Sequence, residues 1–540
     1  MRLFLAVLSA IALLSLVPGA ARVGLAGDYV DPVGRVMAQD EALYANSSIH
    51  MAREGGWLTP EFMGRYALYK PPLLYWLSAA AARVFGISTL VLRLPVAAIA
   101  ALAAALVFLW AAELGGWPAG VLAFALLISN HLWHTLSGMA LTDGLLAAFL
   151  IAALYALFTD PWLESKACFW GFSASVTASI LTKGIAGVLP LGVLGLYWIA
   201  APSRYRPRFR RVAAAAILAI ALAAPWFAWQ WTAHGKWFRA EHVDVEILGY
   251  GAGAPLQTSP EPASLFYAMR LAFTDPMLLA AALVALPAFV AALRLRAAPA
   301  VLLACWLAVT VAAVLSWQYR NIAYLLPMIP ALALLAGVYG PLASRTSPWA
   351  VLAISLALVA PKAATPDAPW GISFARREQP LAPALQNYCR AARANELILV
   401  GMGDDLYGSA LPLSRLRYAL VGASPSIPGP YSMDFARMGI VTTADQFNHL
   451  AQWLPVFRER LLQWGLDSTD AVATLIRVSS PADLAEVVRA HPESDFLVPG
   501  LYRGAADAAH LVVEAYPDYC FLLSRSARAR QEAPAWTCRM

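Results

Sequence analysis

The chain of 540 residues is 60% hydrophobic and only 13% charged, whereas an ordinary soluble domain is about 25% charged. Its net charge of +6 lies largely in short loops between apolar runs, a pattern that orients membrane segments and argues against nucleic acid as a partner. The composition therefore excludes one large soluble domain and predicts repeated passes through a membrane.

The N-terminus has a basic second residue, an apolar run from Leu3 to Pro18, and small residues at Ala20 and Ala21. This pattern is typical of a cleaved signal peptide, which is one interpretation of the segment. The other is a retained first membrane span. We favour retention, because the cleavage-site pattern is weak and the segment leads directly into a loop that carries candidate functional residues.

About eleven apolar segments approach the roughly 20 residues that a helix needs to cross a bilayer. They begin near Leu3, Leu94, Trp117, Gly138, Cys168, Ile185, Val212, Met277, Ala300, Ile322 and Pro348. Two shorter apolar stretches, residues 73–85 and 265–273, are predicted to be interfacial helices. If both crossed the membrane the total would be thirteen, and the later topology would not change.

The most basic short loops fix the predicted orientation. With the N-terminus in the cytoplasm, residues 204–211, Arg294, Arg296 and Arg345 also lie in the cytoplasm, as the positive-inside rule requires. The same count places four stretches on the outer side: residues 26–92, 233–275, 316–321 and everything after 362. We therefore predict a membrane domain over residues 1–361 with outer loops 26–92 and 233–275.

From residue 362 onward the composition is that of a soluble protein. Short β-rich runs at 397–400, 418–421, 512–516 and 521–523 alternate with helical stretches at 443–464 and 481–489. We predict a soluble periplasmic α/β domain over residues 362–540. The glycines at 401 and 403 lack a third glycine and a following helix, so a plain turn is favoured over a nucleotide site.

The five cysteines have no metal-ligand spacing. Cys168 and Cys305 lie in apolar runs and are predicted to be inert. One disulfide is possible among Cys389, Cys520 and Cys538 if the tail lies outside the cytoplasm.

Ionisable residues at a membrane boundary are costly and usually have a role. The predicted topology places many of them at the outer boundary: Asp40, Glu41, Lys70, Asp143, Lys183, Glu241, His242 and Arg320. Each has an ordinary explanation. The acidic pair could be a solvated helix start, and Lys70 could precede a helix whose first turn holds prolines. Lys183 and Arg320 could be snorkelling anchors, and His242 a hydrogen-bonding loop residue.

A functional role is favoured because five separate segments place carboxylates and cations at the same depth in the membrane. A carboxylate can accept the proton of an attacking hydroxyl. Lysine or arginine can neutralise a departing phosphate, which a low-dielectric boundary makes valuable. The predicted chemistry is therefore group transfer from a lipid phosphate.

Five stretches resemble motifs of the GT-C superfamily, in its protein O-mannosyltransferase and lipid A aminoarabinose transferase branch. Asp40-Glu41-Ala42-Leu43-Tyr44-Ala45 resembles D-E-x-x-Y-A, residues 56–60 resemble G-x-W-x-x-P, and residues 69–76 resemble K-P-P-L-x-Y-W. Residues 181–184 resemble an L-T-K-G turn, and residues 320–327 resemble R-x-x-x-Y-L-L-P. The resemblance implies a GT-C fold of about 11–13 transmembrane helices.

The resemblance also implies roles. Asp40 would be the catalytic base or acceptor-positioning carboxylate, supported by Glu41. The remaining matched positions would bind substrate: Tyr44, Lys70, Asp143, Lys183, Arg320 and Tyr324, with Lys70 and Lys183 on the polyprenyl phosphate. The aminoarabinose enzymes typically have arginine where this chain has Leu43, which leaves the sugar open.

The expected reaction is inverting transfer of a hexosyl or pentosyl group from undecaprenyl phosphate to lipid A, a core saccharide or a protein. It would take place at the outer face of the bacterial inner membrane. No nucleotide or other cofactor is implied, and a required divalent metal is not indicated. The alternative from another class is a transporter or flippase of lipid-linked sugars. Against it, no sequence repeat is visible and the interior of the spans is rich in alanine, leucine and valine with few charges. An O-antigen polymerase or ligase is a third possibility.

Overall fold

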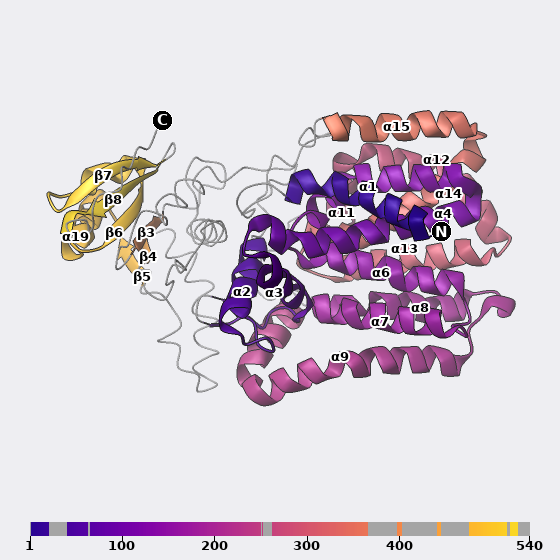
Figure 1. Ribbon diagram of the computed structural model, residues 1–540, viewed down its shortest axis with the longest axis horizontal. Coiled ribbons are helices and arrows are strands. Elements are labelled where there is room, and N and C mark those ends of the chain that lie inside the picture. Colours follow the sequence, from indigo (N-terminus) through magenta and orange to yellow (C-terminus); the bar gives the residue numbers. More distant parts are fainter. Residues whose placement is uncertain are drawn as a thin grey trace.

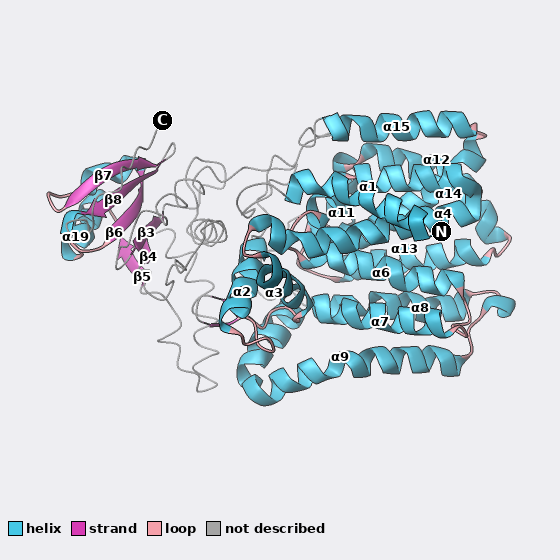
Figure 2. Cartoon of the chain, in the orientation of Figure 1, coloured by secondary structure: helices cyan, strands magenta, loops and turns pink. Residues whose placement is uncertain are grey.

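The computed structural model describes residues 2–20, 40–62, 65–249, 251, 262–364, 397–401, 440–443, 475–515 and 519–526. Up to residue 364 the described chain is almost entirely helical, and after residue 397 it forms a small sheet with few helices (Figure 2). The helical part has the apolar composition and the part with the sheet has the soluble composition.

Long apolar helices lie side by side in the first part (Figure 1). They are α1 (Arg2–Ala20), α4 (Thr89–Ser129), α6 (Thr142–Thr159), α7 (Lys166–Lys183), α8 (Leu189–Ala200), α9 (Phe209–Phe238), α12 (Pro276–Arg294), α13 (Ala298–Ser316), α14 (Ile329–Ser344) and α15 (Pro348–Ala364). Shorter elements join them: α5 (His131–Ser137), η1 (Gly184–Val188), η2 (Ser203–Tyr205), η3 (Arg239–Gly249), α11 (Ala263–Thr274) and η4 (Ile322–Met328).

Helix α4 is two antiparallel helices joined at a glycine. Gly116 has φ 78° and ψ 177°, a left-handed conformation that glycine adopts without steric cost. Beyond it the chain folds back, because the rings of Phe108 and Phe124 meet with centroids 6.4 Å apart. Residues 16 positions apart in one continuous helix would be separated by about 24 Å. The two spans predicted from Leu94 and Trp117 therefore form a tight hairpin.

Seven helical stretches among the described residues are long and apolar enough to cross a membrane, counting α4 as one and α7 to α8 as one. The chain reverses direction within each of these two stretches, at Gly116 in α4 and at the 3₁₀ turn η1 between α7 and α8. Counting each stretch as two segments gives nine. The shorter apolar helices α1 and α15 bring the number to the eleven predicted. The predicted polytopic helical fold is confirmed. The predicted interfacial segments form the short helices α3 (Leu73–Phe85) and α11.

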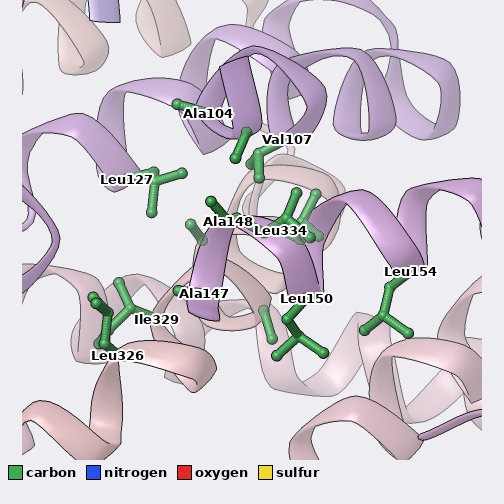
Figure 3. Close-up of a cluster of buried hydrophobic side chains, with 14 of the residues drawn as sticks. Ala104, Val107, Leu127, Ala147, Ala148, Leu150, Leu154, Leu326, Ile329 and Leu334 are labelled. Carbon is green, nitrogen blue, oxygen red and sulfur yellow. The ribbon is translucent and has the colours of Figure 1, made fainter. Parts of the chain in front are cut away.

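The core of the bundle lies between α4, α6, η4 and α14. Figure 3 shows alanines and leucines of these elements facing one another, among them Ala104, Ala148, Leu326 and Leu334. Small residues let helix backbones approach closely, which favours van der Waals packing where lipid removes the hydrophobic driving force. The core of the bundle is thus closely packed by small and aliphatic side chains.

The turns of the bundle fall at two ends (Figure 1). The N-terminus, the break in α4 and the turns after α6, α8, α12 and α14 lie at one end, which includes the arginine-rich residues 204–211. The start of α2 (Asp40–Glu54), helix α3 and the turns after α7, α9 and α13 lie at the opposite end. The predicted segregation of basic loops from candidate functional residues is therefore present in the fold.

Tryptophans fasten the first outer loop to the bundle. The short strands β1 (Glu61–Phe62) and β2 (Arg65–Tyr66) pair in antiparallel fashion. Trp76 Nε1 of α3 donates to the carbonyl oxygen of Trp57 over 2.5 Å, and Trp226 Nε1 of α9 donates to that of Leu58 over 2.8 Å. The loop that ends at Lys70 is thus held by two separate helices.

The second part contains a six-stranded sheet in the order β5-β4-β3-β6-β8-β7. The strands are β3 (Leu397–Gly401), β4 (Ile440–Thr443), β5 (Leu475–Val478), β6 (Asp495–Pro499), β7 (His510–Ala515) and β8 (Tyr519–Ser524). The first four in this order pair in parallel and the last two join in antiparallel fashion. Helix α19 (Pro481–Ala490) and the short η8 (Gly500–Ala505) complete it.

The predicted runs at 397–400 and 521–523 and residues 512–515 of the run at 512–516 form strands, and α19 bears out the helix at 481–489. Residue 516 lies outside the described residues. The run at 418–421 and residues 444–464 lie outside the described residues, as do Cys389 and Cys538. The disulfide and the domain boundary at 362 therefore remain predictions. Cys305 is buried and Cys168 partly buried.

Candidate functional site

Asp40 begins helix α2, which lies at the end of the bundle opposite residues 204–211 (Figure 1). The positive end of the helix dipole favours the carboxylate of Asp40 there. Its side chain keeps some exposed surface although protein surrounds the carboxyl group. Burial raises the pKa of Asp40 above the ordinary 3.8; Glu246 and Asp143 raise the pKa further, while Lys70 and Lys183 lower it. Asp40 is therefore a stronger base than an ordinary aspartate.

Two tyrosines lie against Asp40. The hydroxyl of Tyr44, one turn along α2, donates a long hydrogen bond of 3.4 Å to Asp40 Oδ2. Tyr75 of α3 meets the ring of Tyr44 edge-on, with centroids 5.7 Å apart. The carboxylates of Asp40, Glu241 and Glu246 lie close enough to raise the pKa of Tyr75, after burial, which is the main cause.

Lys70 forms an ion pair with Glu246 of η3, and both side chains are largely buried. Lys70 stands just before the two prolines that lead into α3, where the first helical positions need no backbone donor. Glu246 comes from the second outer loop, 176 residues further along the chain. The ion pair therefore ties the two large outer loops together.

Helix η3 is a π-helix, in which residues five apart share a face. Glu241 accepts from the backbone nitrogen of Leu68 over 2.6 Å, and His242 Nδ1 lies 3.1 Å from the carbonyl oxygen of Tyr69. Glu246, five residues after Glu241, then reaches Lys70. An α-helix would turn Glu246 to another face, so the π-helical register places this carboxylate on the lysine.

His242 is enclosed by aromatic rings and by the turn after α7. Its ring stacks on Phe238 with centroids 5.0 Å apart. Burial, together with the neighbouring charge of Lys70, lowers the pKa of His242 to about 4, so the imidazole is neutral at pH 7. The neutral His242 ring consequently has a structural role, because it links η3 to the backbone of Tyr69.

Asp143 and Lys183 form a second ion pair, between the first turn of α6 and the last residue of α7. The ammonium group of Lys183 also lies 5.2 Å from the ring centroid of Tyr324 in η4, within the range of a cation–π contact. Together with Asp40, Lys70 and Glu246, these residues form the outer site, a name used below for these six residues.

Glu41 faces away from Asp40's partners. Its carboxylate accepts two hydrogen bonds from Arg93, at 2.7 and 2.8 Å, and one from the backbone nitrogen of Ala140 at 2.8 Å. Arg93 and Glu41 are both buried. The pair joins α2 to α4 and to the segment before α6, so Glu41 has a fixed partner one residue from Asp40.

Arg320 lies in the turn before η4, next to Tyr267, whose pKa its charge lowers against the stronger effect of burial. The carboxylates of Asp40 and Glu246 lie close enough to its neighbour Tyr319 to add to the rise in the pKa of Tyr319 that burial causes. The structure thus brings Asp40, Tyr44, Lys70, Asp143, Lys183 and Tyr324 together, and places Glu41 and Arg320 at their border.

Sequence reasoning missed Glu246, Arg93 and Tyr75. Glu246 lies in a predicted outer loop, but only the unusual π-helical register connects it to Lys70. Arg93 precedes a predicted span and looks like an interfacial anchor, although its side chain is fully buried. Leu43 packs against the hydrophobic core. In the described parts of the chain, no group of three histidines, cysteines or carboxylates is arranged to hold a metal.

Comparison with known proteins finds similarity to sugar transferases that use lipid-linked donors. Residues 13–233 match the family model of dolichyl-phosphate-mannose-protein mannosyltransferase. Two curated relatives are undecaprenyl phosphate-alpha-4-amino-4-deoxy-L-arabinose arabinosyl transferases. The one from Aeromonas hydrophila is 30% identical over 199 residues, which are 35% of this chain and 35% of the relative. The one from Pseudomonas paraeruginosa is 31% identical over 201 residues, again 35% of each.

Two solved structures share the fold over almost the whole chain. ArnT from Cupriavidus metallidurans bound to undecaprenyl phosphate has a TM-score of 0.61 at 16% identity, covering 96% of this chain and 97% of that one. Its apo state gives 0.62 at 14% identity with the same coverage. The matches to the curated relatives span about a third of their length, whereas the ArnT fold extends over both described parts. The predicted GT-C fold is confirmed.

Proposed function

We propose that this chain is an inverting glycosyltransferase that moves a sugar from an undecaprenyl phosphate carrier to an acceptor of the bacterial envelope. The observation that carries the proposal is the outer site, where a carboxylate of raised pKa stands between two lysines at one end of a membrane bundle. The similarity to arabinosyl transferases and the ArnT fold support the same chemistry. The acceptor would be lipid A, a core saccharide or a protein.

In the proposed reaction Asp40 is the base. An acceptor hydroxyl attacks the anomeric carbon of the donor sugar and passes its proton to the Asp40 carboxylate. The raised pKa suits this task, because a base must bind the proton firmly to draw it from a hydroxyl. Tyr44 orients the carboxylate through its hydrogen bond, and Glu41, held by Arg93, fixes the start of α2.

The bond from the anomeric carbon to the phosphate oxygen breaks as the new bond forms, and its electrons stay on the phosphate. Lys70 and Lys183 would stabilise that charge at a water-poor boundary, and Tyr324 and Arg320 would line the donor pocket. The polyprenyl chain keeps the phosphate at the membrane surface, which explains a site at the bundle's end. The proposed chemistry uses no nucleotide, and it does not require a divalent metal.

The test is sugar transfer by the purified chain in lipid nanodiscs, with a panel of undecaprenyl phosphate sugars and with envelope glycolipids and proteins as acceptors. Asp40→Asn should lower the rate by about 10²–10⁴-fold, the usual contribution of a general base. Glu54→Gln is the matched control, because Glu54 is an exposed carboxylate at the far end of the same helix. Equal transfer by wild type and Asp40→Asn would sink the proposal, and movement of intact donor across the bilayer without transfer would favour a flippase.

A further inference from the structure

The outer site already holds an anion at each of its lysines. Glu246 pairs with Lys70, and Asp143 pairs with Lys183. A site built only to attract a phosphate would leave these ammonium groups to the ligand, because a carboxylate competes with phosphate for the same donors. The presence of Glu246 therefore requires a physical explanation.

The two carboxylates are held differently. Asp143 stands in the first turn of a spanning helix, and its partner Lys183 also lies over the Tyr324 ring. Glu246 comes from η3, outside the spans, and is aligned with Lys70 by the contacts of Glu241 to Leu68 and of His242 to Tyr69. Rare π-helical geometry is often found at functional sites, and here it delivers one carboxylate to one lysine.

The charge of the phosphate changes during the proposed reaction. The donor is a phosphodiester with one negative charge. The product, undecaprenyl phosphate, is a monoester that carries about −1.5 to −2 at pH 7. Lysines alone would bind the product more tightly than the donor, so the enzyme would be inhibited by its own product.

We propose that Glu246 competes with the product phosphate for Lys70 and so promotes release of undecaprenyl phosphate. This inference rests on the proposed function of the outer site. The singly charged donor displaces Glu246 from Lys70 at modest cost, since its sugar and lipid add further contacts. After transfer, the extra charge on the phosphate is repelled by Glu246, and the carboxylate returns to Lys70 as the product leaves.

The experiment measures binding and needs no sugar transfer. Full-length protein in nanodiscs is titrated with undecaprenyl phosphate and with undecaprenyl methyl phosphate, a phosphodiester that carries one charge on the same lipid. Wild type should bind the two within about threefold of each other. Glu246→Gln should prefer the monoester by about tenfold or more, because a charge repulsion at a partly buried site is worth at least that factor.

Asp244→Asn is the matched control, since Asp244 lies two residues earlier on η3, forms no ion pair with any described residue, and loses the same charge. It should behave as wild type. If wild type prefers the monoester by tenfold, the inference is overturned, and this result does not depend on whether Glu246→Gln folds. If Glu246→Gln folds and its preference equals that of wild type, the inference is also overturned. Failure of sugar transfer by wild type would instead overturn the proposed function.

Discussion

At the scale of single residues, two neighbouring carboxylates have opposite environments. Glu41 is satisfied by a bidentate arginine and a backbone amide. Such a buried pair stabilises little in itself, but leaving one partner alone is costly, so Glu41 is suited to fix geometry. Asp40, one residue earlier, accepts a long hydrogen bond from Tyr44 and has a raised pKa. In the proposed mechanism, Glu41 therefore holds the start of α2 in place, and Asp40, the residue before it, accepts the proton.

The raised pKa of Asp40 leads to a pH prediction for the proposed reaction. Because the base acts only when ionised, transfer should be lost as the pH falls through that pKa, at a value above 3.8. The charge of Glu246 contributes to the raised pKa of Asp40. Glu246→Gln should therefore lower the pH at which the transfer rate falls on the acidic side. Initial rates from pH 4 to 8 measure both effects. If the rate of Glu246→Gln falls at a higher pH than that of wild type, or if the wild-type rate does not fall on acidification, Asp40 is not the base.

At the scale of elements, close contacts between helices form the packed core next to the outer site. Gly337 of α14 lies against the backbone of α4, where an added methyl carbon would stand 2.8 Å from the nitrogen of Ala123 and 2.9 Å from the carbonyl oxygen of Ala119. Those backbone atoms cannot rotate away. Helix α14 also continues from η4, which carries Tyr324, so this contact positions one wall of the site.

Gly337→Ala should therefore destabilise the bundle by about 1–3 kcal/mol, the usual cost of overpacking. Gly340→Ala is the control on the same helix, because nothing lies within 4 Å of the added carbon. It should be neutral or stabilising by up to about 1 kcal/mol, since alanine favours helix more than glycine does. Thermal unfolding of both variants in the same detergent decides the matter, and equal melting temperatures would show that the α4–α14 contact relaxes freely.

At the scale of the whole molecule, charge separates the two ends of the bundle. The arginine-rich residues 204–211 lie at the end of the bundle opposite α2 and α3 (Figure 1), the elements beside which Asp40 and Lys70 stand. The positive-inside rule then favours the arginine-rich end in the cytoplasm and the outer site in the periplasm. A lipid-linked donor presented at the outer leaflet would meet the site directly.

Reporter fusions test this orientation. A cytoplasm-dependent reporter fused after Arg211 should be active, and a periplasm-dependent reporter fused after Lys362 should be active as well. The physical reason is the charge of the short loops, which resist translocation. Activity of a periplasmic reporter at the first site, or of a cytoplasmic one at the second, would reverse the proposed topology.

The sequence by itself determined the membrane class, the eleven apolar segments and most of the outer site. Apolar length and loop charge are local properties, and the motifs around Asp40, Lys70, Lys183 and Tyr324 are contiguous. Tertiary structure alone decided that Arg93 is buried against Glu41 and that Glu246 reaches Lys70. Both pairs join residues far apart in the chain, and the second depends on a π-helix that no local pattern indicates. Packing also raised the pKa of Asp40, because the desolvation that causes this rise arises only in the folded chain.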